Sequence, residues 1–191
     1  METVWVVAGA PGAGKSTVAA ALARALTPHP ALLDKDTVYS SFVDAVLEAA
    51  GKGLGEREGP WYDEHVKVHE YDGLAATTRQ IRGHGCPVLL VAPFTGQIRD
   101  PGRWAAFCAQ LGGDPVRLVW VGCAPDTLRR RLLGRGSHRD EGKLAAFEAF
   151  VARMTPDVPP PVPHIAVDNT DEDRPLIPEV IAALLAAGPS A

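Results

Sequence analysis

Residues 9–17 read Gly9-Ala10-Pro11-Gly12-Ala13-Gly14-Lys15-Ser16-Thr17 and fit the pattern G-x-x-x-x-G-K-[ST] at every position. An apolar, β-prone run at 3–8 precedes this stretch, and a helix-forming run at 15–26 follows it. A phosphate-binding loop needs this order, because a buried strand delivers a glycine-rich turn whose backbone N–H groups converge on phosphate oxygens at a helix start. A glycine-rich turn without a ligand would not explain Lys15 and Ser16 directly after the last glycine, so the stretch predicts a nucleoside triphosphate site.

The residues of this loop have separate expected roles. Lys15 is expected to reach the β- and γ-phosphates, and the hydroxyl of Ser16 to bind Mg²⁺. The full set expected to contact the nucleotide is Gly12, Ala13, Gly14, Lys15, Ser16 and Thr17. ATP rather than GTP is expected, since the guanine-reading motif Asn-Lys-x-Asp is absent from the sequence. The predicted cofactors are therefore ATP and Mg²⁺.

The composition limits the class of protein. The chain has 191 residues and a net charge of −4, with 46% hydrophobic and 22% charged residues. These values are ordinary for a soluble globular protein, and the length suits one domain over residues 1–191, as a monomer or a homodimer. Because the chain has no excess of Lys and Arg, a long nucleic acid is not the expected partner.

The cysteines and the N-terminus bear on the compartment. Cys86, Cys108 and Cys123 are widely spaced and form no C-x-x-C pair, which is typical of reduced thiols in a cytosolic protein. The N-terminal run carries no secretory signal, and no run approaches the roughly 18 apolar residues of a membrane span. We expect a cytoplasmic protein with no membrane partner.

Apolar runs alternate with helix-forming runs along the whole chain. The expected strands are 3–8, 31–33, 87–92, 116–121 and 164–167, and the expected helices are 15–26, 37–50, 61–82, 104–111, 125–133, 143–154 and 177–187. Strands that alternate with helices predict parallel βαβ units, hence an α/β domain whose sheet is covered on both faces. The segment 51–60 has four glycines among its ten residues and is expected to be a flexible loop.

Two other classes of nucleotide-binding protein do not fit the sequence. A switch GTPase would carry the guanine-reading motif and a D-x-x-G switch, and both are absent. A motor or AAA-type ATPase would have an apolar strand that ends in Asp, whereas the run 88–91 continues into Ala92-Pro93-Phe94. The remaining expectation is a phosphoryl-transfer enzyme.

Two carboxylates follow the second expected strand, in the run Leu32-Leu33-Asp34-Lys35-Asp36. Alternate residues of a strand point to the same side, so both carboxylates are expected to face the γ-phosphate. One would help to order Mg²⁺ and the other would accept the proton of an attacking hydroxyl. Asp36 also precedes a helix-forming run, so an N-cap is a second interpretation of that residue, and the two roles are compatible.

The phosphate-binding loop followed about twenty residues later by Leu-Asp-x-Asp resembles the small-molecule P-loop kinases. These include gluconate, shikimate and adenylylsulfate kinases and chloramphenicol phosphotransferase. The resemblance implies a P-loop NTPase fold with a five-stranded parallel sheet in the order 2-3-1-4-5 and a mobile lid. It also implies that Asp36 is the base that faces the acceptor hydroxyl and that Asp34 lies near the metal.

An arginine-rich segment at about 126–142 is the expected lid. Arginine forks bind phosphate oxygens and stabilise charge on the transferring group, so Arg131, Arg135 and Arg139 are catalytic candidates. A solvated basic helix end is the alternative for any one of them. Arg131, Arg135 and His138 resemble the lid of gluconate kinase in their spacing. The Arg139-Asp140 pair that follows is more similar to the stand-alone bacterial AAA-type P-loop kinases.

The acceptor is expected at the carboxyl ends of the second and third strands, where ligands lie in doubly wound sheets. The candidate acceptor-binding residues are Asp36, Tyr39, Arg79, Phe94, Gln97 and Arg99. Core packing is the alternative for Phe94, and a solvated helix position is the alternative for Arg79. The resemblance further places Asp168 beside the adenine, although a turn explains the run Asp168-Asn169-Thr170 equally well.

The sequence thus predicts an ATP- and Mg²⁺-dependent phosphotransferase that moves the γ-phosphate to a hydroxyl of a small metabolite or antibiotic. A polynucleotide 5′-kinase and a zeta-toxin-like kinase of a nucleotide sugar are alternatives with the same loop and acidic strand end. A non-catalytic nucleotide sensor is the alternative from a different class.

Overall fold

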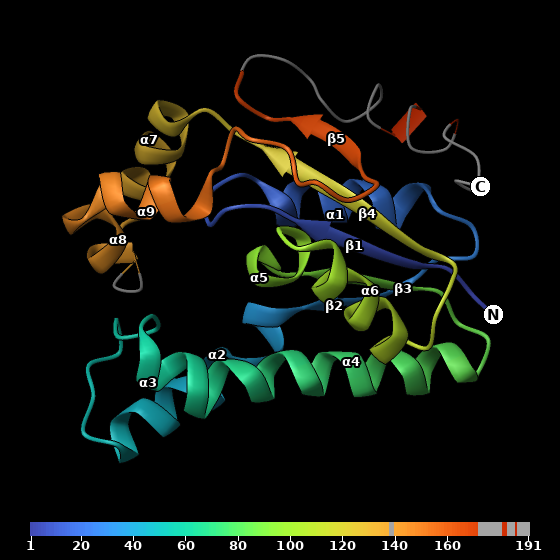
Figure 1. Cartoon of the computed structure of the whole chain (residues 1–191), viewed down its shortest axis with the longest axis horizontal. Helices are drawn as coiled ribbons and strands as arrows, with labels where there is room; N and C mark the ends of the chain where they lie inside the picture. The colour runs from blue at the N-terminus through green and yellow to red at the C-terminus, as the bar shows by residue number, and fades with distance from the viewer. Residues whose placement is uncertain (138–139, 172–180, 183–185, 187–191) are drawn as a thin grey trace.

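The computed structural model describes residues 1–137, 140–171, 181–182 and 186. Its centre is a parallel five-stranded sheet in the order β2-β3-β1-β4-β5 (Figure 1). The strands are β1 (Val4–Ala8), β2 (Ala31–Asp34), β3 (Val88–Val91), β4 (Val116–Gly122) and β5 (Ile165–Asp168). The expected P-loop fold and strand order are confirmed.

Helices cover the sheet on both faces, as Figure 1 shows. They are α1 (Lys15–Ala25), α2 (Lys35–Ala49), α3 (Pro60–Tyr62), α4 (Val68–Gly83), α5 (Thr95–Ile98), α6 (Pro101–Gln110), α7 (Pro125–Arg135), α8 (Glu141–Ala145) and α9 (Phe147–Met154). A π-helical turn, η1 (Asp63–Lys67), joins α3 to α4.

The core lies on the two faces of β1. Trp5 and Val7 point to the face covered by α1, α7 and α9, whereas Val4 and Val6 point to the face covered by α4 and α6. All five residues of β1 are buried. A parallel strand covered on both faces must be apolar at every position, which is why this run does not alternate with polar residues.

The helices differ from the expected ones in three places. The run 61–82 divides into α3, η1 and α4, and the run 143–154 divides into α8 and α9. The short helix α5 was not predicted, because its four residues are too few to show a helical period. The helix expected at 177–187 lies largely outside the described residues.

The segments α2, α3 and η1 pack together beside the start of α4. Their contact has its own small core of Val43, Leu47, Tyr62 and Val66. In Figure 1 this lobe lies opposite α8 and α9, across the carboxyl ends of the strands. Among the described residues, no helix combines the length and the apolar character that crossing a bilayer requires.

Candidate active site

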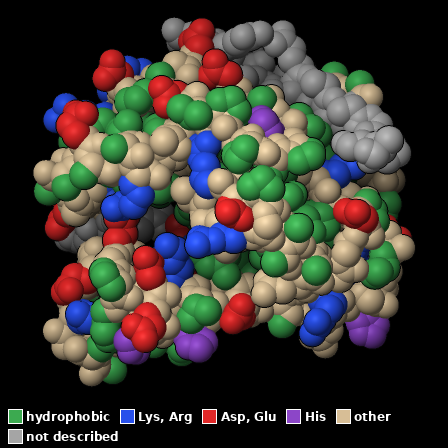
Figure 2. All heavy atoms as spheres, viewed as in Figure 1, with side chains coloured by type: hydrophobic (Ala, Val, Ile, Leu, Met, Phe, Trp, Pro, Cys, Tyr) green, Lys and Arg blue, Asp and Glu red, His purple; other side chains and the backbone are tan. Residues whose placement is uncertain are grey.

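A large cleft opens at the carboxyl ends of the strands. Its volume is about 1310 Å³, and its walls come from the loop after β1, from α2 to α4, from α5 and α6, and from α7 to α9. Figure 2 shows the surface hollowed between the lobe of α7–α9 and the lobe of α2–α3, with basic and acidic side chains around the hollow. Ligands of doubly wound sheets bind at this edge, where the strand order reverses about β1.

The loop of residues 9–14 brings the start of α1 to the cleft. Gly12 and Gly14 have φ values of 88° and 92°, in the left-handed region that glycine adopts without strain. Gly14 is the N-cap of α1, so the unpaired N–H groups and the positive end of that helix face the cleft. The backbone groups of this loop therefore suit a polyanion.

Lys15 lies inside this loop in the ligand-free chain. Its Nζ donates to the carbonyl oxygen of Ala10 over 3.0 Å. Burial lowers the pKa of Lys15 to about 8, although the neighbouring Asp36 and Asp34 act in the opposite direction. A phosphate that replaces the carbonyl oxygen as its partner would raise this pKa again, because a nearby anion favours the charged form of a lysine.

Asn169, which follows β5, is bonded to the loop. Its Nδ2 donates to the carbonyl oxygen of Ala13 over 2.7 Å. A Cβ on Gly14 would lie 2.1 Å from that Nδ2, so the approach requires glycine at position 14. Asp168, the predicted contact to adenine, instead accepts from the backbone N (3.0 Å) and Oγ1 (2.6 Å) of Thr170. It is not among the residues that line the cleft, so the turn interpretation describes its contacts.

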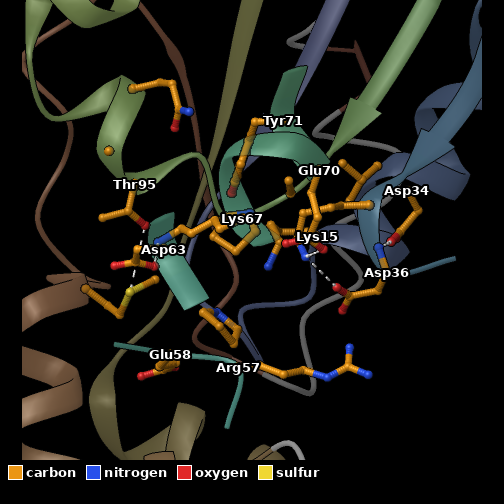
Figure 3. A pocket seen from close by; sticks show the side chains of 18 of the residues that line it. Lys15, Asp34, Asp36, Arg57, Glu58, Asp63, Lys67, Glu70, Tyr71 and Thr95 are labelled. Atoms are coloured by element: carbon orange, nitrogen blue, oxygen red, sulfur yellow. Dashed lines mark hydrogen bonds and ion pairs between the residues drawn. The ribbon is translucent and has the colours of Figure 1, made fainter. Parts of the chain in front are cut away.

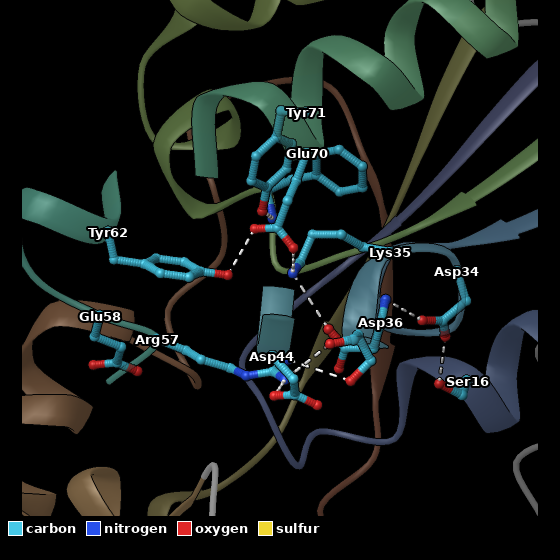
Figure 4. Close-up of polar contacts among 12 residues, drawn as sticks. Ser16, Asp34, Lys35, Asp36, Asp44, Arg57, Glu58, Tyr62, Glu70 and Tyr71 are labelled. Atoms are coloured by element: carbon cyan, nitrogen blue, oxygen red, sulfur yellow. Dashed lines mark hydrogen bonds and ion pairs between the residues drawn. The ribbon is translucent and has the colours of Figure 1, made fainter. Parts of the chain in front are cut away.

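Ser16 and Asp34 bring two side-chain oxygen groups together at the edge of the loop (Figure 4). Ser16 Oγ donates to Asp34 Oδ2 over 3.0 Å. A hydroxyl and a carboxylate are ligands that Mg²⁺ takes in sites shared with substrate phosphates. The two side chains therefore fit the metal that the loop motif implies.

The structure corrects the geometry expected for Asp34 and Asp36. The second strand ends at Asp34, and α2 begins at Lys35, so strand alternation does not relate the two carboxylates. Asp34 is the N-cap, because its Oδ1 accepts from the backbone N of Asp36 over 2.9 Å. Asp36 lies in the first turn of α2, and the interpretation of Asp36 as the cap is wrong. Both residues nevertheless line the cleft.

A buried polar cluster adjoins Asp36, and the sequence analysis did not identify it. Lys35 Nζ lies 2.7 Å from Glu70 Oε1 and 3.3 Å from Asp36 Oδ1. Tyr62 donates its hydroxyl hydrogen to Glu70 Oε2 over 2.8 Å. Glu70 has an exposed fraction of 3%. One sequence signal indicates the burial of Glu70. It lies four residues from each of Val66 and Leu74, so a helix places it on the same face as these two core residues.

Two of the arginines predicted for the lid reach the cleft from α7. Arg131 and Arg135 both line it. Arg135 donates from Nε to Asp140 Oδ2 over 2.8 Å, and its Nη2 lies 2.5 Å from the same oxygen. Arg131 Nη1 lies 3.6 Å from the sulfur of Cys123. Arg139, the third candidate, lies outside the described residues, as does His138.

The structure divides the predicted acceptor residues into two groups. Gln97 and Arg99 line the cleft, as Asp36 does. Tyr39, Arg79 and Phe94 are not among the residues that line it. Arg79 is exposed on α4, Tyr39 packs against the cores beside α2, and the Phe94 ring is fully buried.

Arg99 has a structural bonding pattern. Its guanidinium donates to the backbone carbonyl oxygens of Thr155 (2.7 Å) and Pro159 (3.0 Å). These bonds tie the end of α5 to the segment that follows α9. Sequence spacing could not indicate this use of Arg99, because its partners are backbone atoms that lie at least 55 positions away.

Further residues line the cleft that were not among the predicted acceptor-binding residues. Figure 3 shows Arg57, Glu58, Asp63, Lys67, Tyr71 and Thr95 around the same space as Lys15 and Asp36. Glu58, from the loop 51–60, pairs with Arg153 of α9 across the cleft. Whether that loop is flexible stays a prediction.

Comparison with known proteins identifies a family for this chain. The family described as AAA domain, AAA_33, matches residues 4–156. No curated protein sequence shows a significant match to the chain.

Similar solved structures include a provisionally assigned kinase of Chloroflexus aurantiacus j-10-fl, with 20% identity, 97% of each chain covered and a TM-score of 0.67. A sugar kinase from Janibacter sp. HTCC2649 has 16% identity over 98% of this chain and 96% of the other, with a TM-score of 0.64. The APS kinase of Mycobacterium tuberculosis, in complex with AMPPNP and APS, has 21% identity over 96% and 97%, with a TM-score of 0.52. At these identities the likeness establishes a common fold. Since the family match covers most of the chain, the chain belongs to the AAA domain family AAA_33.

Proposed function

We propose that the protein is an ATP- and Mg²⁺-dependent phosphotransferase that moves the γ-phosphate to a hydroxyl of a small molecule. The observation that carries this proposal is the position of Asp36 in the same cleft as Lys15, Ser16 and Asp34. A carboxylate beside a triphosphate site is what a kinase needs to accept the proton of an attacking hydroxyl.

The size of the cleft supports a reaction of two substrates. Pockets for one small ligand have volumes of roughly 300–1,000 Å³. The cleft measures about 1310 Å³ and continues from the loop after β1 past Asp36 to α5 and α6. It therefore has space for a nucleotide at the loop and for an acceptor beside Gln97 and Thr95.

Different residues of the chain have different roles in phosphoryl transfer. The amides at the start of α1 and the ammonium of Lys15 hold the β- and γ-phosphates. Ser16 and Asp34 would hold Mg²⁺, which would neutralise charge on the phosphate oxygens. Asp36 accepts a hydrogen bond from the acceptor hydroxyl and takes its proton as the new O–P bond forms, while the bond between the γ-phosphorus and the β–γ bridging oxygen breaks and ADP leaves. Arg131 and Arg135 of the lid stabilise the charge of the transferring group and exclude water.

The names of two structural neighbours agree with this proposal. One is a sugar kinase, and another is an APS kinase bound to the ATP analogue AMPPNP. Both act, by name, on small molecules. We also place the protein in the cytoplasm, where Cys86, Cys108 and Cys123 would remain thiols.

A transfer screen tests the proposal. The purified chain, Mg²⁺ and [γ-³²P]ATP are incubated with sugar acids, polyols, nucleosides, amino-hydroxy acids, hydroxylated antibiotics, UDP-sugars and a 5′-OH oligonucleotide. We expect a labelled small product from the wild type, and at least a hundredfold less from Asp36→Asn, in line with the roughly 10²–10⁴-fold contribution of general-base catalysis. Label on the oligonucleotide alone, or ATP binding without any labelled acceptor, would overturn the proposal.

A further inference from the structure

We propose that Lys35 is a positioning residue that fixes the orientation of the Asp36 carboxylate, and that Glu70 and Tyr62 hold Lys35 in place. This inference rests on the proposed function, in which Asp36 accepts the proton of the acceptor. It assigns a role in the reaction to a buried cluster whose charges have no other evident use in the fold.

The cluster joins three elements at one point (Figure 4). Lys35 opens α2, Tyr62 ends α3, and Glu70 lies in the first turn of α4. The two oxygens of Glu70 are both used, one by Lys35 at 2.7 Å and the other by the Tyr62 hydroxyl at 2.8 Å. These contacts hold Lys35 Nζ in a defined position. In that position Nζ is 3.3 Å from Asp36 Oδ1.

Burial differs sharply along this chain of contacts. The Lys35 side chain has an exposed fraction of 11%, and that of Glu70 is 3%, whereas the Asp36 side chain has an exposed fraction of 46%. A half-exposed aspartate on a helix has several accessible rotamers, and a fixed cation beside one oxygen favours one of them. The fixed position of Lys35 thus restricts the orientation of the more exposed Asp36 carboxylate, which faces the cleft.

Stability alone does not explain the cluster. Withdrawing a lysine and a glutamate from water costs several kcal/mol for each ion, and apolar residues of similar volume often give an equal or greater stability. Burial and the nearby Glu70 raise the pKa of Tyr62, so its hydroxyl stays protonated and continues to donate. Lys35, Tyr62 and both oxygens of Glu70 each have a polar partner within the cluster, which favours one arrangement over several.

Orientation of the base has a direct kinetic consequence. A base accepts a proton efficiently when its oxygen lies within hydrogen-bond reach of the hydroxyl. A misplacement of about 1 Å can reduce turnover by about a hundredfold. Loss of Lys35 should therefore lower kcat and leave nucleotide binding at the loop after β1 unchanged.

The test replaces the whole cluster by apolar side chains of similar shape. The triple variant Lys35→Met, Glu70→Met, Tyr62→Phe leaves no buried charge without a partner, unlike any of the single variants. We expect its free energy of unfolding to equal or exceed that of the wild type, and its ADP affinity to stay within about twofold, because no group that binds the nucleotide is removed. Its kcat for the acceptor that the wild type phosphorylates fastest in the panel above should fall by about 10- to 100-fold.

Two further variants separate positioning from a structural role. Lys35→Arg keeps a cation between the carboxylates of Glu70 and Asp36. Its kcat should stay within about fivefold of the wild-type value, since the guanidinium fork can reach both carboxylates. Lys52→Met removes a lysine that lies outside the lining of the cleft and should leave kcat unchanged.

The outcomes are distinct. A triple variant that is stable and also transfers at the wild-type rate would show that the cluster only supports the fold, and would overturn the inference. A triple variant with a lower kcat, a free energy of unfolding no lower than that of the wild type and an unchanged ADP affinity supports the inference. If the wild type itself labels no acceptor in the panel, the proposed function fails, and the positioning role fails with it.

Discussion

Asn169 Nδ2 donates to the carbonyl oxygen of Ala13 over 2.7 Å, which bonds the loop after β5 to the phosphate-binding loop after β1. The two strands are not neighbours in the sheet, because β4 lies between them. The phosphate-binding loop is therefore bonded to a residue 156 positions further along the chain.

This bond predicts that Asn169→Ala weakens the nucleotide site and the fold together. Loss of one hydrogen bond costs about 1 kcal/mol, equivalent to a fall in Tm of about 2–4 °C and a rise in the ADP Kd of up to about fivefold. Calorimetry and ADP titration measure both effects. Asn169→Asp should be worse in both assays, because it sets a carboxylate against the Ala13 carbonyl oxygen. Wild-type values for Asn169→Asp would contradict this account.

Asp34 is predicted to have two functions that separate by substitution. Asp34→Asn keeps a side-chain oxygen that can cap α2 but removes the charge beside Ser16, so the free energy of unfolding should change by no more than about 0.5 kcal/mol. The Mg²⁺ concentration needed for half-maximal transfer should rise by about tenfold or more, since a charged oxygen ligand is lost. Asp34→Ala should show this change and also lose about 1 kcal/mol of stability. An unchanged Mg²⁺ requirement in Asp34→Asn would exclude Asp34 as a metal ligand.

The lowered pKa of Lys15 predicts that nucleotide affinity depends on pH. In the ligand-free chain this pKa is about 8, so the ammonium is lost as the pH rises through that value. Because phosphate binding needs the ammonium, the affinity for ADP should fall by about tenfold between pH 7 and pH 9. Isothermal titration over this range measures the change. Lys15→Met should bind weakly with little pH dependence, and Lys15→Arg should keep its affinity at pH 9.

The same shift affects the stability of the ligand-free fold in the opposite direction. The folded pKa of about 8 lies below the ordinary value of 10.5, so the unfolded chain binds the extra proton between these values. The contribution of Lys15 to the free energy of unfolding therefore rises with pH across that window. Comparing the wild type with Lys15→Met isolates this contribution.

Arg82 is predicted to stabilise the fold and to have no direct part in transfer. It is buried and donates to the carbonyl oxygens of Glu2 (2.6 Å), Leu111 (3.2 Å), Gly113 and Pro115 (3.4 Å). Arg82→Met leaves these acceptors without their donor and should lower the free energy of unfolding by about 3 kcal/mol.

The neighbouring Arg79 is a matched control on the same helix. It is exposed, so Arg79→Met should change the free energy of unfolding by less than about 0.5 kcal/mol. Urea unfolding compares the two variants. Equal stabilities would contradict the role of Arg82, and Arg82→Lys should recover part of the loss, because an ammonium cannot reproduce the planar fork.

The sheet was predictable from the sequence because its strands are continuous apolar runs separated by helical runs. The phosphate-binding loop was predictable because Gly12, Gly14, Lys15 and Ser16 act through local geometry at fixed spacing. The pairing of Asp34 with Asp36 was identified, but its geometry was wrong. Because Asp34 caps it, α2 begins at Lys35, two residues before the expected helix start at residue 37.

The acceptor side was predictable only in part. The cluster around Glu70 depends on contacts among α2, α3 and α4, and no local spacing encodes which residues meet there. Arg99 and Phe94 were placed near the acceptor by their distance from β3, yet one bonds to backbone carbonyls and the other fills the core. A loop position identifies a neighbourhood, whereas the direction of each side chain depends on the packing of the whole domain.

The strand order has a consequence for the chain as it is synthesised. β1 pairs with β3 and β4, and β2 pairs with β3. β1 and β2, the first two strands to leave the ribosome, therefore do not pair with each other. Each can pair with β3 only after residues 88–91 have been synthesised. Until then the apolar β1 and the phosphate-binding loop behind it have no sheet to join, a state that favours binding by chaperones. Ribosome-bound fragments that stop before and after β3 should differ abruptly in their resistance to protease.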